Sequence, residues 1–141
     1  MLTRAQKKAP VDTDLILDLY EALFRPSVDA GITDSAALRG WRNSSVGLRG
    51  WRYIPPNPKK IPDLIGGLER FATKKDLSPI ARALLVHLEF VTIHPFTDGN
   101  GRLGRLFVWH AVQQSATDLL DKQRGSKPAR RTRRPKPRVV K

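Results

Sequence analysis

Residues 93–105 have the sequence IHPFTDGNGRLGR, and this stretch limits what the chain can fold into. Apolar segments lie on both sides of it. Because Pro95 disfavours the α conformation at His94, the preceding helix is expected to stop at that histidine. A new helix is expected to begin near Gly99–Asn100. The stretch is therefore predicted to be a short loop that leads from the end of one helix into the start of the next.

The start of the second helix has the features of a phosphate-binding site. A helix N-terminus presents unpaired N–H groups and the positive end of the helix dipole. Gly99 and Gly101 let the backbone approach an anion closely, because they carry no Cβ. Arg102 and Arg105 are three positions apart, so they share one helix face. Two guanidinium groups on that face could clamp a polyphosphate through paired hydrogen bonds.

Asp98 and His94 extend this site from binding to chemistry. A carboxylate repels phosphates, so Asp98 is best explained by a Mg²⁺ ion bound by the carboxylate and by phosphate oxygens. His94 has an intrinsic pKa that suits a base taking a proton from an attacking hydroxyl. The combination predicts metal-assisted transfer from a nucleotide to a hydroxyl group. Each of these residues alone also has a structural explanation, and Phe96 is expected to be a core residue that fixes the loop.

Two helices are predicted in the first half of the chain. The segment that begins at Asp12 has acidic residues at its start and leucines at four-residue spacing, and it is expected to end at Pro26. A second helix is predicted for about residues 61–74, with Pro62 in its first turn and an apolar face.

The helix that leads into the loop is predicted to begin at Pro79, with Ser78 as its N-cap. It is expected to be mostly buried, because apolar residues cover most of its circumference. The predicted core stripe consists of Ile80, Leu84, Leu88 and Val91, widened by Leu85, Val86 and Phe90. The helix after the loop is predicted to run on through LGRLFVWHAVQQ.

One segment, residues 41–58, is predicted to form a β-hairpin. Glycines at two positions can supply turn conformations, and prolines close the segment. The residues that favour extended structure are Val46, Leu48, Trp51, Tyr53 and Ile54, and the turn glycines are Gly47 and Gly50.

Charge and composition limit the class of protein. The formal net charge is +13, but the last 20 residues hold 10 basic residues and no acidic one, against 16 basic and 13 acidic residues in the rest of the chain. The basic character therefore belongs mainly to the tail and does not indicate a nucleic-acid-binding fold. The chain has no cysteine, which excludes disulfides and thiolate metal sites. It has no apolar run of the roughly 20 residues that a membrane span needs and no signal-peptide core, so a cytoplasmic location without membrane contact is expected.

The segment HPFTDGNGRLGR, residues 94–105, resembles the signature HPFx(D/E)GNGRxxR of the Fic (filamentation induced by cAMP) family and matches every fixed position. Upstream, GWR, IPDLIGGL and VTIHPF add to the resemblance. It implies an all-α fold, a Fic-type helical bundle with a small β-hairpin flap. The domain is expected to span residues 12–120, after a flexible N-terminus (1–11) and before a disordered basic tail (121–141).

The activity that the resemblance implies is protein AMPylation. In this reaction AMP moves from ATP to a Ser, Thr or Tyr hydroxyl of a target protein, and pyrophosphate is released. The implied cofactor is Mg²⁺, ATP is the implied substrate, and a target protein with a hydroxyl side chain is the implied partner.

The signature also assigns roles to individual residues. His94 would be the general base and Asp98 the Mg²⁺ ligand. The phosphates would be held by Gly99, Asn100, Gly101, Arg102 and Arg105, while Pro95 and Phe96 would be structural. The flap would lay the target segment down as an extra strand and place its hydroxyl in line with the nucleotide; a hairpin that only packs against the core is the alternative. The flap residues are Val46, Gly47, Leu48, Arg49, Gly50, Trp51, Arg52 and Tyr53.

Two features depart from the family pattern. The inhibitory motif Ser/Thr-x-x-x-Glu is absent, because Leu17, Ile65 and Leu85 stand four positions before the three glutamates. Inhibition would therefore need a separate antitoxin chain that carries the motif. In addition, the Arg/Pro-rich tail takes the place of the further helices with which the family usually continues.

These departures leave alternatives to an active AMP transferase. The chain could be a truncated, catalytically impaired Fic remnant that acts as a binding or interaction protein. It could be a Fic enzyme that uses another phosphate-containing donor, although Asp98 and Asn100 favour AMP transfer over phosphate transfer. The basic tail could contact nucleic acids non-specifically and in a salt-dependent way.

Overall fold

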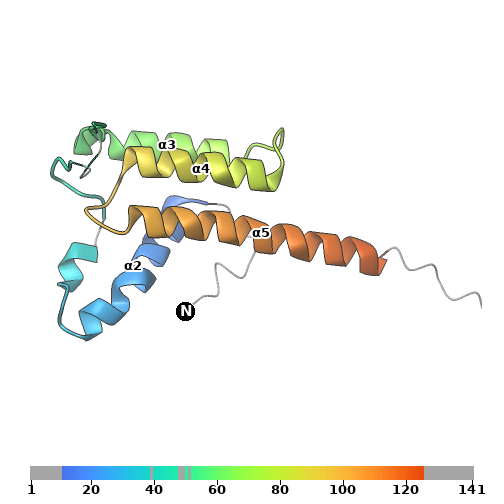
Figure 1. The fold of residues 1–141 in the computed structure, drawn as a ribbon, viewed down its shortest axis with the longest axis horizontal. Helices are drawn as coiled ribbons and strands as arrows, with labels where there is room; N and C mark the ends of the chain where they lie inside the picture. The colour runs from blue at the N-terminus through green and yellow to red at the C-terminus, as the bar shows by residue number, and fades with distance from the viewer. Residues whose placement is uncertain (1–10, 39, 48–49, 51, 126–141) are drawn as a thin grey trace, which may run out of the picture.

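The computed structural model describes residues 11–38, 40–47, 50 and 52–125, and within them it contains helices and no strand. The four α-helices are α2 (Thr13–Asp29), α3 (Ile61–Ala72), α4 (Pro79–Ile93) and α5 (Asn100–Gly125). Two short 3₁₀ turns, Ser35–Leu38 and Pro58–Lys60, lie between α2 and α3. The predicted all-α class is therefore confirmed (Figure 1).

The predicted helix starts are confirmed by their caps. The Asp12 carboxylate accepts the N–H of Leu15 at 2.8 Å at the start of α2. The Ser78 hydroxyl accepts the N–H of Ala81 at 3.2 Å, and Pro79 is the first residue of α4. Each cap satisfies an N–H group that the helix itself leaves unpaired.

The predicted end of α2 is wrong. Pro26 lies inside the helix, which continues to Asp29. A proline removes only its own N–H donor, and its carbonyl can still accept; here it accepts the N–H of Ala30 at 3.1 Å. Because Pro26 has no N–H, the carbonyl four residues before it loses its helical partner. Pro26 is exposed, so water can bond to that carbonyl instead.

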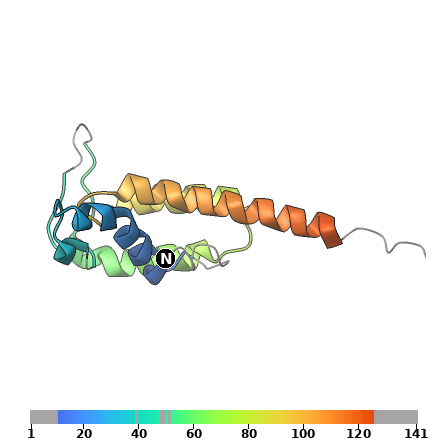
Figure 2. The same ribbon diagram turned by 90° about the horizontal axis from the view of Figure 1, so that it is seen from below.

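The helices pack as a small bundle around an aromatic centre. α4 lies between α3 and α5 and packs most extensively against α5, while α2 crosses near the start of α5 (Figure 1). The C-terminal part of α5 extends past the other helices (Figure 2). At the centre, Phe90 and Phe107 meet edge to face with ring centroids 4.9 Å apart. The buried core consists of Ile16, Tyr20, Phe24, Leu38, Ile61, Ile65, Leu68, Val86, Phe90, Ile93, Phe96, Leu103 and Phe107.

The predicted core stripe of α4 is largely wrong. Three of its four members, Ile80, Leu84 and Leu88, are exposed. Of the residues predicted to widen the stripe, Val86 and Phe90 are buried and Leu85 is exposed. The helix also buries Ala83 and Ile93. Because α4 is apolar on two adjacent faces, helical periodicity allows either face to be the core, and only the neighbouring helices decide between them.

The predicted β-hairpin is not found. In the described parts of residues 41–58 no strand is present, and no ladder of backbone hydrogen bonds joins the two sides of the segment. The described stretches on either side of residues 48–51 project away from the helices (Figure 2). Glycines and the prolines at 55, 56 and 58 disfavour a regular ladder, since proline has no N–H to donate. The predicted flap residues Leu48, Arg49 and Trp51 lie outside the described residues.

Two further predictions concern the ends of the chain. The basic tail was predicted from residue 121, but residues 121–125 are the last turn of α5, and 126–141 lie outside the described residues. Most of the predicted flexible N-terminus, residues 1–10, also lies outside them. None of the described helices is long and apolar enough to cross a membrane.

Candidate active site at the start of α5

His94 ends α4 in a left-handed conformation. Its φ and ψ are 51° and 60°, and it is the only non-glycine residue of the described chain with a positive φ. Pro95 excludes the right-handed α conformation at His94, as predicted, but the residue turns to the left-handed region and not to an extended one. The sharp turn directs the chain from α4 into the loop that precedes α5.

The His94 ring has one nitrogen bonded and one available. Nδ1 lies 3.2 Å from the carbonyl oxygen of Val91. A carbonyl oxygen only accepts, so the proton of the neutral ring is on Nδ1. Nε2 then carries the lone pair. This is the tautomer that a general base needs.

The surroundings of His94 keep its ring neutral. Burial lowers the pKa of His94 below its ordinary value of 6.5, and the positive charge of Arg42 acts in the same direction. The hydrogen bond to Val91 and the charge of Asp98 oppose this shift without cancelling it. At pH 7 the ring is therefore mostly unprotonated and able to accept a proton.

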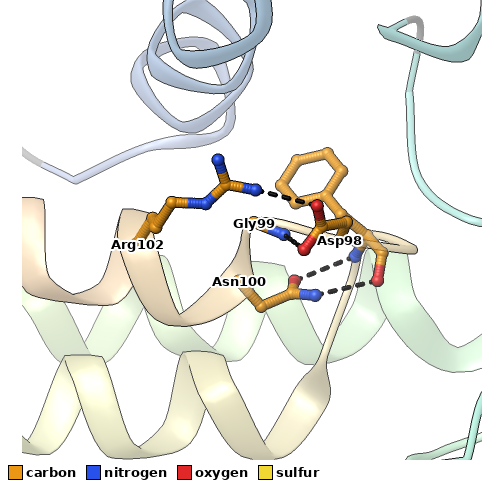
Figure 3. A network of polar contacts seen from close by, with 5 residues as sticks. Asp98, Gly99, Asn100 and Arg102 are labelled. Carbon is orange, nitrogen blue, oxygen red and sulfur yellow. Dashed lines mark hydrogen bonds and ion pairs between the residues drawn. The ribbon is translucent and has the colours of Figure 1, made fainter. Parts of the chain in front are cut away.

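The buried side chain of Asn100 holds the loop in place through hydrogen bonds to its backbone. Its side chain is almost fully buried, with 2% of the residue exposed. Its Oδ1 accepts the N–H of Phe96 at 3.0 Å, and its Nδ2 donates to the Phe96 carbonyl at 2.8 Å (Figure 3). Both polar atoms of the Asn100 side chain therefore bond the loop backbone. The group of Asn100 that can bind a ligand is its backbone N–H, at the first position of α5.

Asp98 and Arg102 lie on the outer side of the same loop (Figure 3). One carboxylate oxygen of Asp98 accepts the N–H of Gly99 at 2.6 Å, and the other is 2.8 Å from Nη2 of Arg102. Both side chains are exposed, so the pair contributes at most about 1 kcal/mol and can open for a ligand. The carboxylate and the guanidinium are therefore both within reach of a phosphate group bound at the start of α5.

Phe24 of α2 supports this side of the loop. The Arg102 guanidinium lies over the Phe24 ring, 4.9 Å from its centroid. Gly99 has a φ of 81°, and a Cβ at this position would lie 2.8 Å from Phe24 Cε2. A side chain at position 99 is thus excluded twice, by the backbone conformation and by the ring. Arg105, a predicted phosphate ligand, folds back along the helix toward Gly101. Its Nη1 lies 3.6 Å from the position that a Cβ would occupy if residue 101 carried one.

Phe96 and Pro95 lie in the core, which fits the structural roles predicted for them. Both are almost completely buried. The Phe96 ring stacks on Tyr20 of α2, with centroids 3.7 Å apart and an interplanar angle of 6°. The Trp41 ring also packs against Phe96, with the two ring centroids 5.3 Å apart. The loop is therefore anchored to the core by one aromatic side chain.

Of the described flap residues, Tyr53 is brought to the site. Its hydroxyl donates to the carbonyl of Thr92, two residues before His94, at 3.1 Å. Val46 is half-buried, whereas Gly47, Gly50 and Arg52 are exposed. The segment is thus attached to the end of α4 by a side chain and not by strand pairing.

Arg42 belongs to the site, although no role was predicted for it. It is buried, and its Nε donates to the carbonyl of His94 at 2.7 Å. The available signal was the segment GWR at 40–42, where an arginine sits between a tryptophan and a polar turn. Composition alone favours an exposed arginine there, because buried arginines are rare.

The residues fit a Mg²⁺ ion only together with a nucleotide. In the described part of the chain no group of three His, Cys, Asp or Glu side chains could hold a metal. Asp98 supplies a single exposed carboxylate next to the open N–H groups of α5. Mg²⁺ is commonly held by one or two carboxylates and by substrate phosphates, and a lone carboxylate beside an anion site suits that arrangement.

Comparisons with known proteins agree on one family. A sequence model of the Fic/DOC family matches residues 10–112. The chain is 32% identical over 103 residues to a probable protein adenylyltransferase of Aquifex aeolicus and 41% identical over 109 residues to a protein adenylyltransferase Fic of Nematostella vectensis. These matches cover 72% and 75% of this chain but 30% and 24% of the relatives.

A solved structure shows the same arrangement of helices. It is a Fic family protein from Desulfovibrio desulfuricans G20, with a TM-score of 0.60 and 30% sequence identity. The match covers 74% of this chain and 31% of that one. The chain thus spans less than a third of the length of each of these relatives.

Proposed function

This chain belongs to the Fic/DOC family, and we propose that it is a protein adenylyltransferase that moves AMP from ATP to a Ser, Thr or Tyr hydroxyl of a target protein. The observation that carries the proposal is the state of His94. Its ring is neutral, with the proton on Nδ1 held by Val91 and the lone pair on Nε2. This ring stands at the entry to a loop in which all nine fixed positions of the signature are filled.

The proposed reaction is an in-line displacement at phosphorus. The hydroxyl oxygen of the target attacks the α-phosphorus of ATP, and the bond from that phosphorus to the pyrophosphate oxygen breaks. Nε2 of His94 takes the hydroxyl proton as the new P–O bond forms. AMP remains on the target, and pyrophosphate leaves with the electron pair of the broken bond.

The start of α5 would hold the triphosphate. The open N–H groups of Asn100, Gly101 and Arg102 supply hydrogen-bond donors and the positive end of the helix dipole. The guanidinium groups of Arg102 and Arg105 add charge on the same side. Asp98 is the carboxylate that would hold Mg²⁺ jointly with phosphate oxygens, where the cation would offset the charge of the triphosphate.

The partners remain part of the proposal. The target is a protein with an accessible hydroxyl, and the segment that carries Tyr53 is the surface against which it would dock. The proposal includes a separate antitoxin chain that carries the Ser/Thr-x-x-x-Glu motif, in the setting of a cytoplasmic toxin–antitoxin pair. Contact of the basic tail with nucleic acid would be an additional, non-specific property.

Labelling with two forms of ATP tests the reaction. The purified chain is incubated with Mg²⁺, a cell lysate and ATP labelled at either the α- or the γ-phosphorus. Label from the α-position only should appear on protein, and His94→Ala should abolish it, because His94 is the only imidazole in the loop. His110→Ala is the matched control: this histidine bonds Gln114 on α5 and should leave labelling unchanged.

The outcomes separate the candidate functions. Equal labelling by His94→Ala would sink the proposed mechanism. Label from the γ-position would indicate a Fic enzyme that transfers phosphate. No labelling by a folded wild-type chain would favour the remnant, for which the exposed apolar side chains Leu84, Leu88 and Trp109 are the structural argument.

A further inference from the structure

Arg42 makes four hydrogen bonds to backbone carbonyls. Its guanidinium donates from Nε to His94 at 2.7 Å, from Nη1 to Ser44 at 2.8 Å and from Nη2 to Pro56 at 2.7 Å. Its own backbone N–H donates to the carbonyl of Pro95 at 2.9 Å. Only 6% of the residue is exposed. One residue therefore contacts three separate parts of the chain.

The proposed reaction requires these three parts of the chain to be aligned with one another, because they carry the base and the docking segment. Ser44 and Pro56 are the two ends of the projecting segment that carries Tyr53. His94 carries the proposed base, and Pro95 follows it in the loop. The guanidinium thus fixes both ends of the proposed docking segment to the backbone of the residue that would take the proton.

The conformation of His94 depends on such contacts. A left-handed conformation in a non-glycine residue costs about 1–3 kcal/mol and persists only where the surroundings hold it. Three contacts hold His94: its N–H donates to Phe90 at 3.0 Å, its Nδ1 bonds Val91, and its carbonyl accepts from Arg42. The first two lie within the last turn of α4. Arg42 is the one that connects His94 to another segment.

Stability alone gives a poor explanation for this arginine. A buried guanidinium loses its hydration, and burial lowers the pKa of Arg42. Among the described residues no carboxylate forms an ion pair with it, so only carbonyl dipoles offset that loss. The planar fork of arginine suits several acceptors held in fixed directions, which the point charge of lysine cannot match.

We propose that Arg42 is a positioning residue that sets His94 against the segment between Ser44 and Pro56, so that the base and a docked hydroxyl meet in one geometry. The inference rests on the proposed adenylyl transfer. Arg42 touches neither the nucleotide site at the start of α5 nor the ring of His94. It acts through the His94 carbonyl and through the ends of the segment.

The test compares Arg42→Lys with Arg82→Lys. Arg82 also donates to a backbone carbonyl, that of Lys74, but lies at the other end of α4. With α-labelled ATP and the lysate protein that the wild type labels, Arg42→Lys should slow labelling at saturating ATP by about a hundredfold, the loss expected for a misplacement of about 1 Å. The ATP concentration for half-maximal rate should stay unchanged, because the α5 site is intact. Arg82→Lys should change neither value.

A purely structural role predicts a different pattern. In that case Arg42→Lys would lower the melting temperature, and labelling at a temperature where circular dichroism shows the variant folded would equal that of the wild type. That result would overturn the inference. If Arg42→Lys does not fold, Tyr53→Phe tests the same attachment from the segment side, since it removes only the bond to Thr92; unchanged labelling by Tyr53→Phe would then count against the inference.

A measurement without activity keeps this inference separate from the proposed function. In ¹⁵N spectra of the histidine rings, the wild type should show His94 as the Nδ1–H tautomer. Arg42→Lys should mix its tautomers and move the amide signals around it, while the rings of His87 and His110 stay unchanged. A wild type that labels nothing but shows this change would refute the proposed function and retain the role of Arg42. An unchanged His94 ring would overturn that role whatever the activity.

Discussion

His94 combines a strained backbone with a neutral ring, and both follow from its place at the end of α4. The turn that Pro95 forces brings the ring back over the last turn of the helix, where Val91 binds its Nδ1. Burial and the charge of Arg42 then lower its pKa. A single residue thus connects the loop geometry to the protonation state that the proposed chemistry needs.

The lowered pKa of His94 predicts a pH dependence of stability. As the pH falls below about 6.5, the unfolded chain binds a proton at this ring before the folded chain does. The contribution of His94 is therefore fully present above pH 6.5 and is lost as the pH falls through the lower, folded-state pKa. Urea unfolding at pH 7.5 and 5.5 should show a larger loss of unfolding free energy for the wild type than for His94→Asn, which keeps a residue that tolerates the left-handed conformation. An equal loss in both would show that His94 is not shifted.

Single residues also mark how far sequence reasoning reaches. The structural roles of Pro95 and Phe96 follow from proline geometry and aromatic burial, and the burial of both residues fits those roles. Asn100 was predicted to hold phosphates, whereas its amide is bonded to the backbone of Phe96. Arg42 received no role at all, because the acceptors that satisfy its buried charge come from segments distant in sequence.

At the scale of helices, the starts of α2 and α4 were predictable, and the buried face of α4 was not. The caps at Asp12 and Ser78 are local, so a few residues determine them. The exposed face of α4 depends on which helices lie against it, and Leu84 and Leu88 are as apolar as the residues that form the core. The predicted hairpin is not found in the described residues, and the physical reason is similar: extended residues give a strand only when a partner strand completes the hydrogen bonds.

The crossing of α4 and α5 gives a prediction at this scale. A Cβ on Gly104 would lie 2.9 Å from Cδ2 of His87, so Gly104→Ala should force the helices apart and lower the unfolding free energy by about 1–3 kcal/mol. Gly66→Ala is the matched control within α3, where the nearest atom is 3.6 Å away at the end of a flexible arginine. It should stabilise by about 0.5–1 kcal/mol. Adding His87→Ala should recover part of the loss at Gly104; additive effects would contradict the crowding.

At the scale of the whole molecule, α2, α4 and α5 meet at one end of the bundle. The loop between α4 and α5 lies there: its Phe96 ring stacks on Tyr20 of α2, and Phe24 of α2 lies under the guanidinium of Arg102. The resemblance of the motif predicted a Fic-type helical bundle, and the match to a Fic family structure supports the helical arrangement. The far part of α5 lies beyond the other helices and takes no part in the loop (Figure 2).

The change in unfolding free energy on adding MgATP tests whether the folded molecule binds the nucleotide. If MgATP binds at the start of α5, a concentration a hundred times its Kd should raise the unfolding free energy by about 2.7 kcal/mol. Arg102→Ala should lose this gain, because its guanidinium would contact the phosphates. Arg25→Ala removes a comparable i,i+4 ion pair, with Glu21 on α2, and should retain the gain. Unfolding scans with and without MgATP measure both; loss of the gain in Arg25→Ala as well would point to a general effect of charge.

The Phe24 ring makes two contacts: it packs beside Gly99, and the guanidinium of Arg102 lies over its face. These two contacts restrict how the family can diverge at these positions. A lineage that replaced the ring by a smaller side chain would free space at position 99 and, in the same step, leave the arginine without support. We therefore expect positions 24 and 102 to change together among descendants of this chain, while the positive φ keeps glycine at position 99. Phe24 lies in a helix outside the signature, yet its contact with Arg102 ties it to the signature.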